Sequence, residues 1–392
     1  MLEFAYHLRR RLMPVLCAGL LVGCSSGGGG DTDASALSPA AALGEKIFAD
    51  KSLSASGQMA CATCHDPARA HAGNTAVVAG GADLTTPGFR NPPSLRYANL
   101  TPAFHFDDGP VGGFDRDGRA ATLSDQAHQP LLAAFEMANA DAAAFAARLR
   151  AASYASAFAA LFGPNIFDDG TAALDRATYA LQQYQMEDAE FHSYSSKYDA
   201  FLTGRVQLSE QELRGLKLFN DPQKGNCAAC HPSSRGADGS LPLFTDFSYD
   251  NLGVPRNFDI PANADPSYYD LGLCGPDRVD LLQQSDLCGA FKVPTLRNIT
   301  LTGPYFHNGR FATLKEALQF YVRRDTNPEE FYPLGTDGQV QKFNDLPAQY
   351  HVNVNITEVP YNRKPGDQPD LSDSEIDDVI VFLGTLTDGY SP

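Results

Sequence analysis

Two copies of one short motif constrain this chain of 392 residues more than any other feature. Both have the pattern C-x-x-C-H, with Cys61, Cys64 and His65 in the first copy and Cys227, Cys230 and His231 in the second. In this pattern two thiols form thioethers with haem vinyl groups, and the adjacent His ligates the iron. With 8 Cys and 9 His in the chain, only roughly 0.004 such matches are expected by chance. Zinc binding or thiol exchange would use a bare C-x-x-C pair, without the following His. The sequence therefore predicts two covalently bound c-type haems.

The residues before the two motifs are also similar, which indicates an internal duplication. Residues 44–50 and 215–221 share a Gly-x-Lys-x-Phe-x-Asp pattern and read as amphipathic helices. A capping box at 209–212 begins the second helix, and another at 372–375 precedes a C-terminal helix with apolar residues at helical spacing (Ile376, Val379, Ile380, Leu383 and Leu386). We therefore expect a mainly α fold with two cytochrome-c-like helical domains, residues 37–205 and 206–392, each with one haem.

The N-terminus has the pattern of an export signal. Three Arg at 9–11 precede an apolar run over 12–23, which is too short for a permanent membrane span. The run ends at Cys24 and resembles a bacterial lipobox, so residues 1–23 are predicted to be a signal peptide and Cys24 to be lipidated. An ordinary signal peptide with an incidental Cys is the alternative. Residues 24–36 would form a flexible tether. Ser25, the residue after the Cys, resembles that of lipoproteins sorted to the outer membrane. The resemblance implies a Gram-negative bacterium and a position on the periplasmic side of that membrane, with membrane contact only through the lipid.

The chain carries a formal net charge of −17, and removal of the three Arg and one Glu in residues 1–23 would make it −19. This charge makes nucleic acid an unfavourable partner and favours a protein with a positive docking face. The alternative is that the acidity only keeps an exported protein soluble.

Two cysteines, Cys274 and Cys288, lie between the second motif and the C-terminal helix. In an oxidising compartment they are expected to form a disulfide that closes this loop. Free thiols or a metal site are the alternatives.

The positions of the methionines restrict the second haem. The five Met stand at 1, 13, 59, 137 and 186, so none follows the second motif, and a His/Met haem built within the second domain is excluded. His307, His351 or an oxygen ligand such as a Tyr remains as the second axial ligand there.

Several longer stretches resemble the bacterial di-haem cytochrome c peroxidase and MauG family over residues 40–390. These stretches are 90–95, 117–137, 291–298, 301–309 and 313–321. The resemblance implies that Tyr321 takes the position of the second axial ligand, which is Met in ordinary peroxidases and Tyr in MauG-like enzymes. A phenolate stabilises oxidised iron, so it would lower the haem potential. In the alternative, Tyr321 is an ordinary aromatic residue of a helix and His307 binds the iron.

The resemblance also implies three residues around the first haem: Gln126, Pro130 and Glu136. Gln126 and Glu136 match a distal pair that guides proton movement during cleavage of peroxide, and Pro130 matches a proline near the open face of the iron. Ordinary peroxidases close this iron with a His on a loop, but Gly80 and Gly81 occupy the corresponding stretch. The first haem is therefore expected to be five-coordinate, with His71 and His105 as alternative ligands.

A calcium site between the haems is implied in the same way. Asn91, with backbone carbonyls of Thr302 and Pro304, matches the family's site, and an all-oxygen ligand set suits Ca²⁺.

The chain departs from the family at one place. The family usually has a Trp between the haems in an F-W-D-G-R stretch, as a relay for charge, but this chain has no Trp and Arg116 takes that position. Arg cannot act as a redox relay, so charge would pass directly between porphyrin edges or through another aromatic such as Phe114.

The resemblance implies three functions. The first is a MauG-like enzyme that uses hydrogen peroxide to oxidise side chains of a periplasmic or secreted protein. Within the family, the loop from Cys274 to Cys288 looks most like the MbnH branch, which acts on a small copper-binding partner. The second is a cytochrome c peroxidase that reduces hydrogen peroxide to water with electrons from a small periplasmic donor. The third is an electron carrier without catalysis.

Overall fold

The computed structural model describes residues 36–391. The predicted signal peptide, Cys24 and nearly all of the tether lie outside the described residues. Within residues 36–391, no helix has the length and apolar character needed to cross a membrane.

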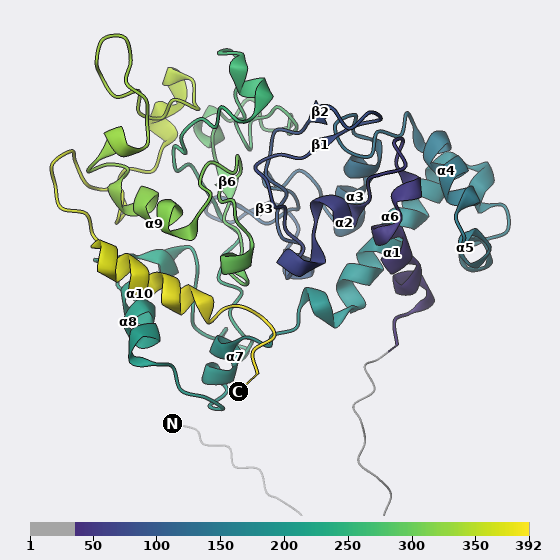
Figure 1. The fold of residues 1–392 in the computed structure, drawn as a ribbon, viewed down its shortest axis with the longest axis horizontal. Helices are drawn as coiled ribbons and strands as arrows, with labels where there is room; N and C mark the ends of the chain where they lie inside the picture. The colour runs from purple at the N-terminus through teal and green to yellow at the C-terminus, as the bar shows by residue number, and fades with distance from the viewer. Residues whose placement is uncertain (1–35, 392) are drawn as a thin grey trace, which may run out of the picture. The chain divides into compact units, whose positions relative to one another are not determined.

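The described chain is mainly helical, as predicted (Figure 1). Its helices are α1 (Pro39–Ala49), α2 (Cys61–Cys64), α3 (Leu123–Leu132), α4 (Ala142–Ala151), α5 (Ala155–Phe162), α6 (Gly170–Glu187), α7 (Lys197–Leu202), α8 (Glu210–Asn220), α9 (Leu314–Arg323) and α10 (Asp373–Gly384). The strands are only two residues long and form three antiparallel pairs: β1 (Ala79–Gly80) with β2 (Thr86–Pro87), β3 (His105–Phe106) with β4 (Pro110–Val111), and β5 (Tyr249–Asp250) with β6 (Phe291–Lys292).

Two hydrophobic cores organise these helices. In the first, α1, α3 and α4 pack against α6, and the core includes Ile47, Phe48, Phe145, Phe158 and Phe191. In the second, α8 and α9 pack against α10, and the core includes Phe219, Phe244, Leu318, Val379 and Phe382. Figure 1 shows α10 crossing α8 beside α9. Each core therefore supports one of the two C-x-x-C-H motifs.

The predicted starts of both helices are confirmed. The Ser209 and Ser372 side chains accept hydrogen bonds from Glu212 N and Glu375 N, and both pairs form complete capping boxes. Leu386, predicted as part of the C-terminal helix, follows its end at Gly384 but is still buried at 1% exposure.

The segment at the predicted domain boundary is ordered and folded into the second core. Residues 197–202 form α7, and Tyr198 packs against Phe244 and Phe382. Asp199 is buried and pairs with Arg297 at 2.8 Å. The division at residues 205 and 206 stays a prediction.

The duplication extends beyond the helices before the motifs. Tyr97 and Asn298 both have a left-handed backbone, with φ of 62°, and each precedes a short 3₁₀ turn, at 98–100 and 299–301. Further along, Thr122 caps α3 and Thr313 caps α9. The two halves therefore follow the same path from the proline-rich segment to the helix that faces the motif.

One glycine in each repeat permits close helix packing. A Cβ at Gly44 in α1 would lie 2.0 Å from the Ala180 carbonyl oxygen in α6, and a Cβ at Gly215 in α8 would lie 2.1 Å from the Asp378 carbonyl oxygen in α10. These distances are far below van der Waals contact, and the opposing atoms belong to helix backbone. The repeated Gly therefore has a packing role in both halves.

We expect Gly215→Ala to lower the free energy of unfolding of the haem-loaded protein by about 1–3 kcal/mol, because α8 must move away from α10. Urea unfolding followed by far-ultraviolet circular dichroism measures this change. The matched control is Gly384→Ala, because Gly384 lies in α10 with open space around its Cβ position. An equal loss in both variants would show that helix approach is not the cause.

Candidate active site

One internal cavity of about 490 Å³ is lined by both motifs, including Cys61, Cys64, His65, Cys227, Cys230 and His231. Within the described residues, none of these four cysteines belongs to a disulfide. Burial raises the pKa of Cys61 and of Cys227 to about 12. A buried thiol with a raised pKa is not a reactive thiolate, so these surroundings do not suit thiol exchange.

Both motif histidines are held by backbone carbonyls. His65 Nδ1 lies 3.0 Å from the Pro93 oxygen, and His231 Nδ1 lies 2.7 Å from the Phe244 oxygen. Burial lowers the pKa of both imidazoles, which favours the neutral form. With Nδ1 as the donor, the Nε2 lone pair of each ring is free to bind a metal.

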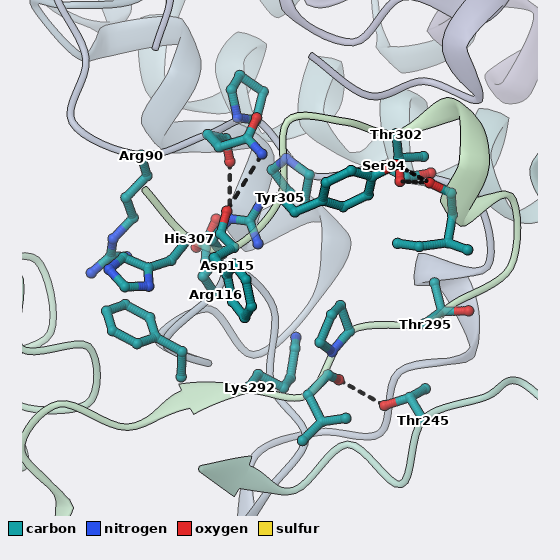
Figure 2. A pocket seen from close by; sticks show the side chains of 18 of the residues that line it. Arg90, Ser94, Asp115, Arg116, Thr245, Lys292, Thr295, Thr302, Tyr305 and His307 are labelled. Atoms are coloured by element: carbon teal, nitrogen blue, oxygen red, sulfur yellow. Dashed lines mark hydrogen bonds between the residues drawn. The ribbon is translucent and has the colours of Figure 1, made fainter. Parts of the chain in front are cut away.

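Cations that line the cavity also fit a haem. Arg90 is paired with Asp270 at 2.6 Å and with Asp117 at 2.7 Å. In contrast, among residues 36–391 the Arg116 side chain donates only to the Asn91 carbonyl, from Nε at 2.9 Å, and the Lys292 ammonium donates only to the Gly113 carbonyl. Figure 2 shows Arg90, Arg116 and Lys292 around the same space.

Burial lowers the pKa of Arg116 to about 10 and that of Lys292 to about 8. A buried cation without an anion is costly, so the cavity calls for a negatively charged occupant. The propionate carboxylates of haem supply such charges. The thiols, the imidazoles and the unpaired cations together fit the group that the motifs predict.

Gln126, Pro130 and Glu136 line the same cavity as the first motif. Gln126 Nε2 donates to Asp115 Oδ1 at 3.3 Å, while Glu136 Oε2 is buried without a hydrogen-bond partner. Burial, together with the nearby charge of Asp115, raises the pKa of Glu136 to about 7. A carboxyl group with this pKa can take up and release a proton near neutral pH.

The raised pKa of Glu136 predicts the pH dependence of the peroxide reaction. Because the carboxylate form accepts a proton, the rate should fall about tenfold for each pH unit below 7 and level off above it. Stopped-flow mixing with peroxide between pH 5 and 9 measures this acidic limb of the pH–rate profile, the part in which the rate falls below pH 7. In Glu136→Gln the limb should disappear and the plateau should fall on the order of 10²-fold. A limb that persists in this variant would assign the titration to another group.

The loop that closes the first iron in ordinary peroxidases packs tightly here. Gly81 N donates to the Glu136 carbonyl at 2.9 Å, and a Cβ at Gly80 would lie 2.2 Å from the Phe135 carbonyl oxygen. Of the alternative ligands, His71 is fully buried between the Phe48 and Phe191 rings, and His105 is exposed. Neither histidine is among the residues that line the cavity.

The duplication allows the residues that face the two motifs to be compared. Pro130 in α3 and Tyr321 in α9 lie the same number of positions after their capping threonines, Thr122 and Thr313. Both line the cavity. A proline side chain has no donor atom for a metal, whereas a tyrosine has a phenolic oxygen. The two helices therefore place a side chain without a donor atom near one motif and a phenolic oxygen near the other.

Tyr321 lies near the second motif. Its surroundings include Cys227 and Cys230, and its ring centroid is 6.1 Å from that of Tyr361. His307 also lines the cavity, but its ring stacks on Phe291 with a centroid distance of 3.7 Å. His351 Nε2 lies 3.1 Å from the Leu346 carbonyl and does not line the cavity.

The residues of the predicted calcium site meet in part. Asn91 Nδ2 donates to the Pro304 carbonyl at 2.6 Å, and Asn91 Oδ1 is buried without a partner. Thr302 lines the same cavity. With the amide reversed, Oδ1 and the Pro304 oxygen would face one point, as calcium requires. Residues 36–391 contain no cluster of three or more His, Cys, Asp or Glu side chains suited to a metal.

The wall between the motifs contains the residue that replaces the family's Trp. Arg116 and Phe114 both line the cavity, and Lys292 N donates to the Arg116 carbonyl at 2.9 Å. The sequence analysis did not single out Lys292 or Asp270. Lys292 lies within the stretch 291–298, but no sequence pattern indicates that its charge is unpaired.

Cys274 and Cys288 form a disulfide with their Cα atoms 5.0 Å apart. The enclosed loop packs on the residues around Arg116, since Arg278 Nη1 donates to the Asp117 carbonyl at 2.8 Å and Asp277 pairs with Arg119 at 3.5 Å.

The chain is similar to several known proteins. Residues 38–207 match the protein family described as "Di-haem cytochrome c peroxidase". Methylamine utilization protein MauG of Paracoccus denitrificans is 38% identical over 370 residues, which cover 90% of this chain and 89% of that protein. The structure of the diheme peroxidase BthA from Burkholderia thailandensis superimposes with a TM-score of 0.82 at 40% identity, covering 89% of this chain and 86% of that one.

A MauG-like protein associated with microbial copper homeostasis is also similar, with a TM-score of 0.64 at 28% identity over 90% of this chain and 91% of that one. The chain therefore belongs to the bacterial di-haem cytochrome c peroxidase and MauG family of peroxide-dependent oxidoreductases.

Proposed function

We propose that this protein activates hydrogen peroxide at its first motif and uses the oxidising equivalents to oxidise side chains of a partner protein. The observation that carries the proposal is that Pro130 and Tyr321 occupy equivalent positions in the two halves of the duplicated fold. This arrangement supports an open iron beside His65 and a closed iron held by His231 and Tyr321.

In this proposal the four motif cysteines form thioethers with two haems, and Arg116 and Lys292 bind haem carboxylates. The haems supply the redox chemistry, because their irons exchange electrons with peroxide. The protein orients them through His65 and His231, whose Nδ1 atoms are fixed by backbone carbonyls.

Glu136 and Gln126 manage the proton of the incoming peroxide. The Glu136 carboxylate accepts this proton and can return it to the leaving oxygen as the bond breaks. Gln126 is anchored on Asp115 through Nε2 and lines the same cavity. Pro130 leaves room for the peroxide because it offers no ligand.

Tyr321 would bind the iron of the second haem together with His231. Burial raises the pKa of Tyr321, so the phenolate form depends on the positive charge of the iron beside it. An anionic oxygen ligand stabilises oxidised iron, which allows this site to share oxidising equivalents.

The partner is proposed to be a protein on the periplasmic side of the outer membrane, where the lipidated Cys24 would hold the enzyme. The net charge of −17 favours a positively charged docking face on that partner. Identity with BthA, 40%, exceeds that with the copper-associated protein, 28%, so the likeness does not favour a copper-binding partner over another protein.

A second candidate function is a cytochrome c peroxidase that reduces peroxide with electrons from a small periplasmic donor. The similarity to BthA, a diheme peroxidase, favours it, and so does Arg116 at the position of the family's Trp relay.

Stoichiometric peroxide added to the diferric protein distinguishes the two functions. The partner-oxidising enzyme should change its Soret and near-infrared bands directly. A reductively activated peroxidase should respond only after one-electron reduction and should then turn over with a soluble donor. No response of the diferric protein would reject the first function, and no response in either state would leave electron carriage.

A further inference from the structure

Tyr97 links the haem cavity to a buried carboxylate. Four tyrosines of the described residues line this cavity: Tyr97, Tyr305, Tyr321 and Tyr361. Of these four, only Tyr97 donates its hydroxyl to a carboxylate, with 2.8 Å to Asp388 Oδ1 and 3.0 Å to Oδ2. Tyr305 instead donates to the Ile299 carbonyl at 3.0 Å. The Tyr97 side chain is 2% exposed, so water does not compete for its hydroxyl.

The phenolic oxygen of Tyr97 also accepts hydrogen bonds. Tyr194 N donates to it at 3.0 Å, and Arg297 Nη1 approaches to 3.4 Å. Two hydrogen bonds to the oxygen stabilise it after its proton has left. The charge of Arg297 is offset by Asp199, which it contacts at 2.8 and 2.9 Å.

Asp388 is held in place to face Tyr97. Its side chain is 3% exposed and accepts hydrogen bonds from Asn298 Nδ2 at 2.7 Å and Ser195 N at 3.2 Å. Arg96 lies 3.7 Å away. Arg96 is also paired with Glu190 at 3.1 Å, so Asp388 shares this cation with a second carboxylate.

Asp388 also borders a second hollow of about 270 Å³, together with Lys197, Glu212 and Tyr390. Tyr97 borders the haem cavity on its other side. The donor and the acceptor of this hydrogen bond therefore border different hollows.

The chemistry of tyrosine gives this hydrogen bond a use. The chain has no Trp, so tyrosine is its most readily oxidised aromatic. Burial raises the pKa of Tyr97, so its hydroxyl stays protonated and can lose an electron readily only if its proton leaves as well. The equivalent position in the other half is Asn298, which cannot be oxidised in this way.

We propose that Tyr97 and Asp388 form a proton-coupled redox pair that holds one oxidising equivalent on Tyr97, at the wall of the haem cavity. Hydrogen peroxide is the oxidant, and each molecule takes up two electrons and two protons to become two waters. Tyr97 gives one electron to the peroxide-oxidised haem centre, its phenolic O–H bond breaks, and Asp388 takes the proton. The partner protein of the proposed function then returns one electron to the neutral Tyr97 radical, and Asp388 returns the proton. Two such cycles deliver two electrons from the partner to each peroxide, and the two protons that form water come from the solvent. The inference rests on the proposed reaction with peroxide.

Freeze-quench electron paramagnetic resonance of the haem-loaded protein tests the pair. After stoichiometric peroxide, protein carrying ring-deuterated tyrosine should show a narrowed tyrosyl radical signal. In Tyr97→Phe this signal should be absent, and the peroxide-induced optical change should decay roughly tenfold more slowly, as expected for a barrier raised by the loss of one pathway.

Asp388→Asn keeps a hydrogen-bond acceptor but cannot take the proton as a carboxylate does. The radical should form on the order of 10²-fold more slowly in this variant. A structural role of Asp388 would change thermal stability without changing this rate, and the Soret band reports whether each variant has folded around its haems.

Tyr154→Phe is the matched control. Tyr154 is buried at 8% exposure and donates to Asp50 Oδ2 at 2.7 Å, but it does not line the cavity. Its loss should leave the radical unchanged. A normal optical response to peroxide with an unaltered radical in Tyr97→Phe would overturn this inference alone. No optical response in the unmodified protein would overturn the proposed function and this inference together.

Discussion

Replacing Tyr321 with Phe should convert the second haem from a six-coordinate to a five-coordinate form without loss of either haem. The phenolate is its only proposed protein ligand opposite His231, and α9 offers no substitute at the Tyr321 position. Without this anionic oxygen, the reduction potential of the second haem should rise on the order of 0.1–0.2 V, a fraction of the range that axial ligands span. The direct response of the diferric protein to peroxide should then disappear.

Spectroelectrochemistry and low-temperature electron paramagnetic resonance measure both changes. The matched control is Tyr361→Phe, because the Tyr361 ring lies 6.1 Å from that of Tyr321 and borders the same cavity. The control should keep the six-coordinate spectrum. If Tyr321→Phe keeps it too, His307 becomes the ligand and its ring must leave the stack on Phe291.

Replacing both Cys227 and Cys230 with Ser should release the second haem and destabilise the whole second core. Haem that binds only the folded state adds its binding free energy to stability, so the loss should exceed about 4 kcal/mol. The cavity would also keep the unpaired charge of Lys292 without its counter-ion. The pyridine haemochrome assay should fall from two haems per chain to one, and the midpoint of thermal unfolding should fall with it.

The disulfide cysteines supply a control with the same number of substitutions. Cys274→Ser with Cys288→Ser opens a loop with a sequence separation of 14 and should cost about 3 kcal/mol of stability. Both haems should stay attached. Loss of haem in this control would mean that the loop, and not the thioethers, retains the cofactor.

The sequence predicted the local features well because their causes are local. The C-x-x-C-H motifs, the capping boxes at Ser209 and Ser372, and the amphipathic helices before each motif depend on residues a few positions apart. The family resemblance placed Gln126, Glu136 and Tyr321, and the structure brings all three to one cavity. Their chemical roles stay predictions until the variants are measured.

Features that depend on distant residues could not be predicted in the same way. Tyr97 and Asp388 are separated by 291 positions, and neither belongs to a motif. Arg116 has no carboxylate partner because the carboxylates nearby are bound by other cations. Asp270, for example, is paired with Arg90. The pKa of Glu136 depends on burial, which one sequence does not reveal. Charge balance in a folded interior is a property of the whole molecule.

Asp388 has a consequence for biogenesis. It accepts hydrogen bonds from Tyr97 in one half of the chain and from Asn298 in the other, and it follows α10, a helix of the second core. These contacts cannot form until residue 388 has been synthesised, so both C-x-x-C-H motifs are complete before the two halves are joined here. Closure after loading would trap both cofactors in the shared interior, and the order of assembly would follow from the position of a single carboxylate.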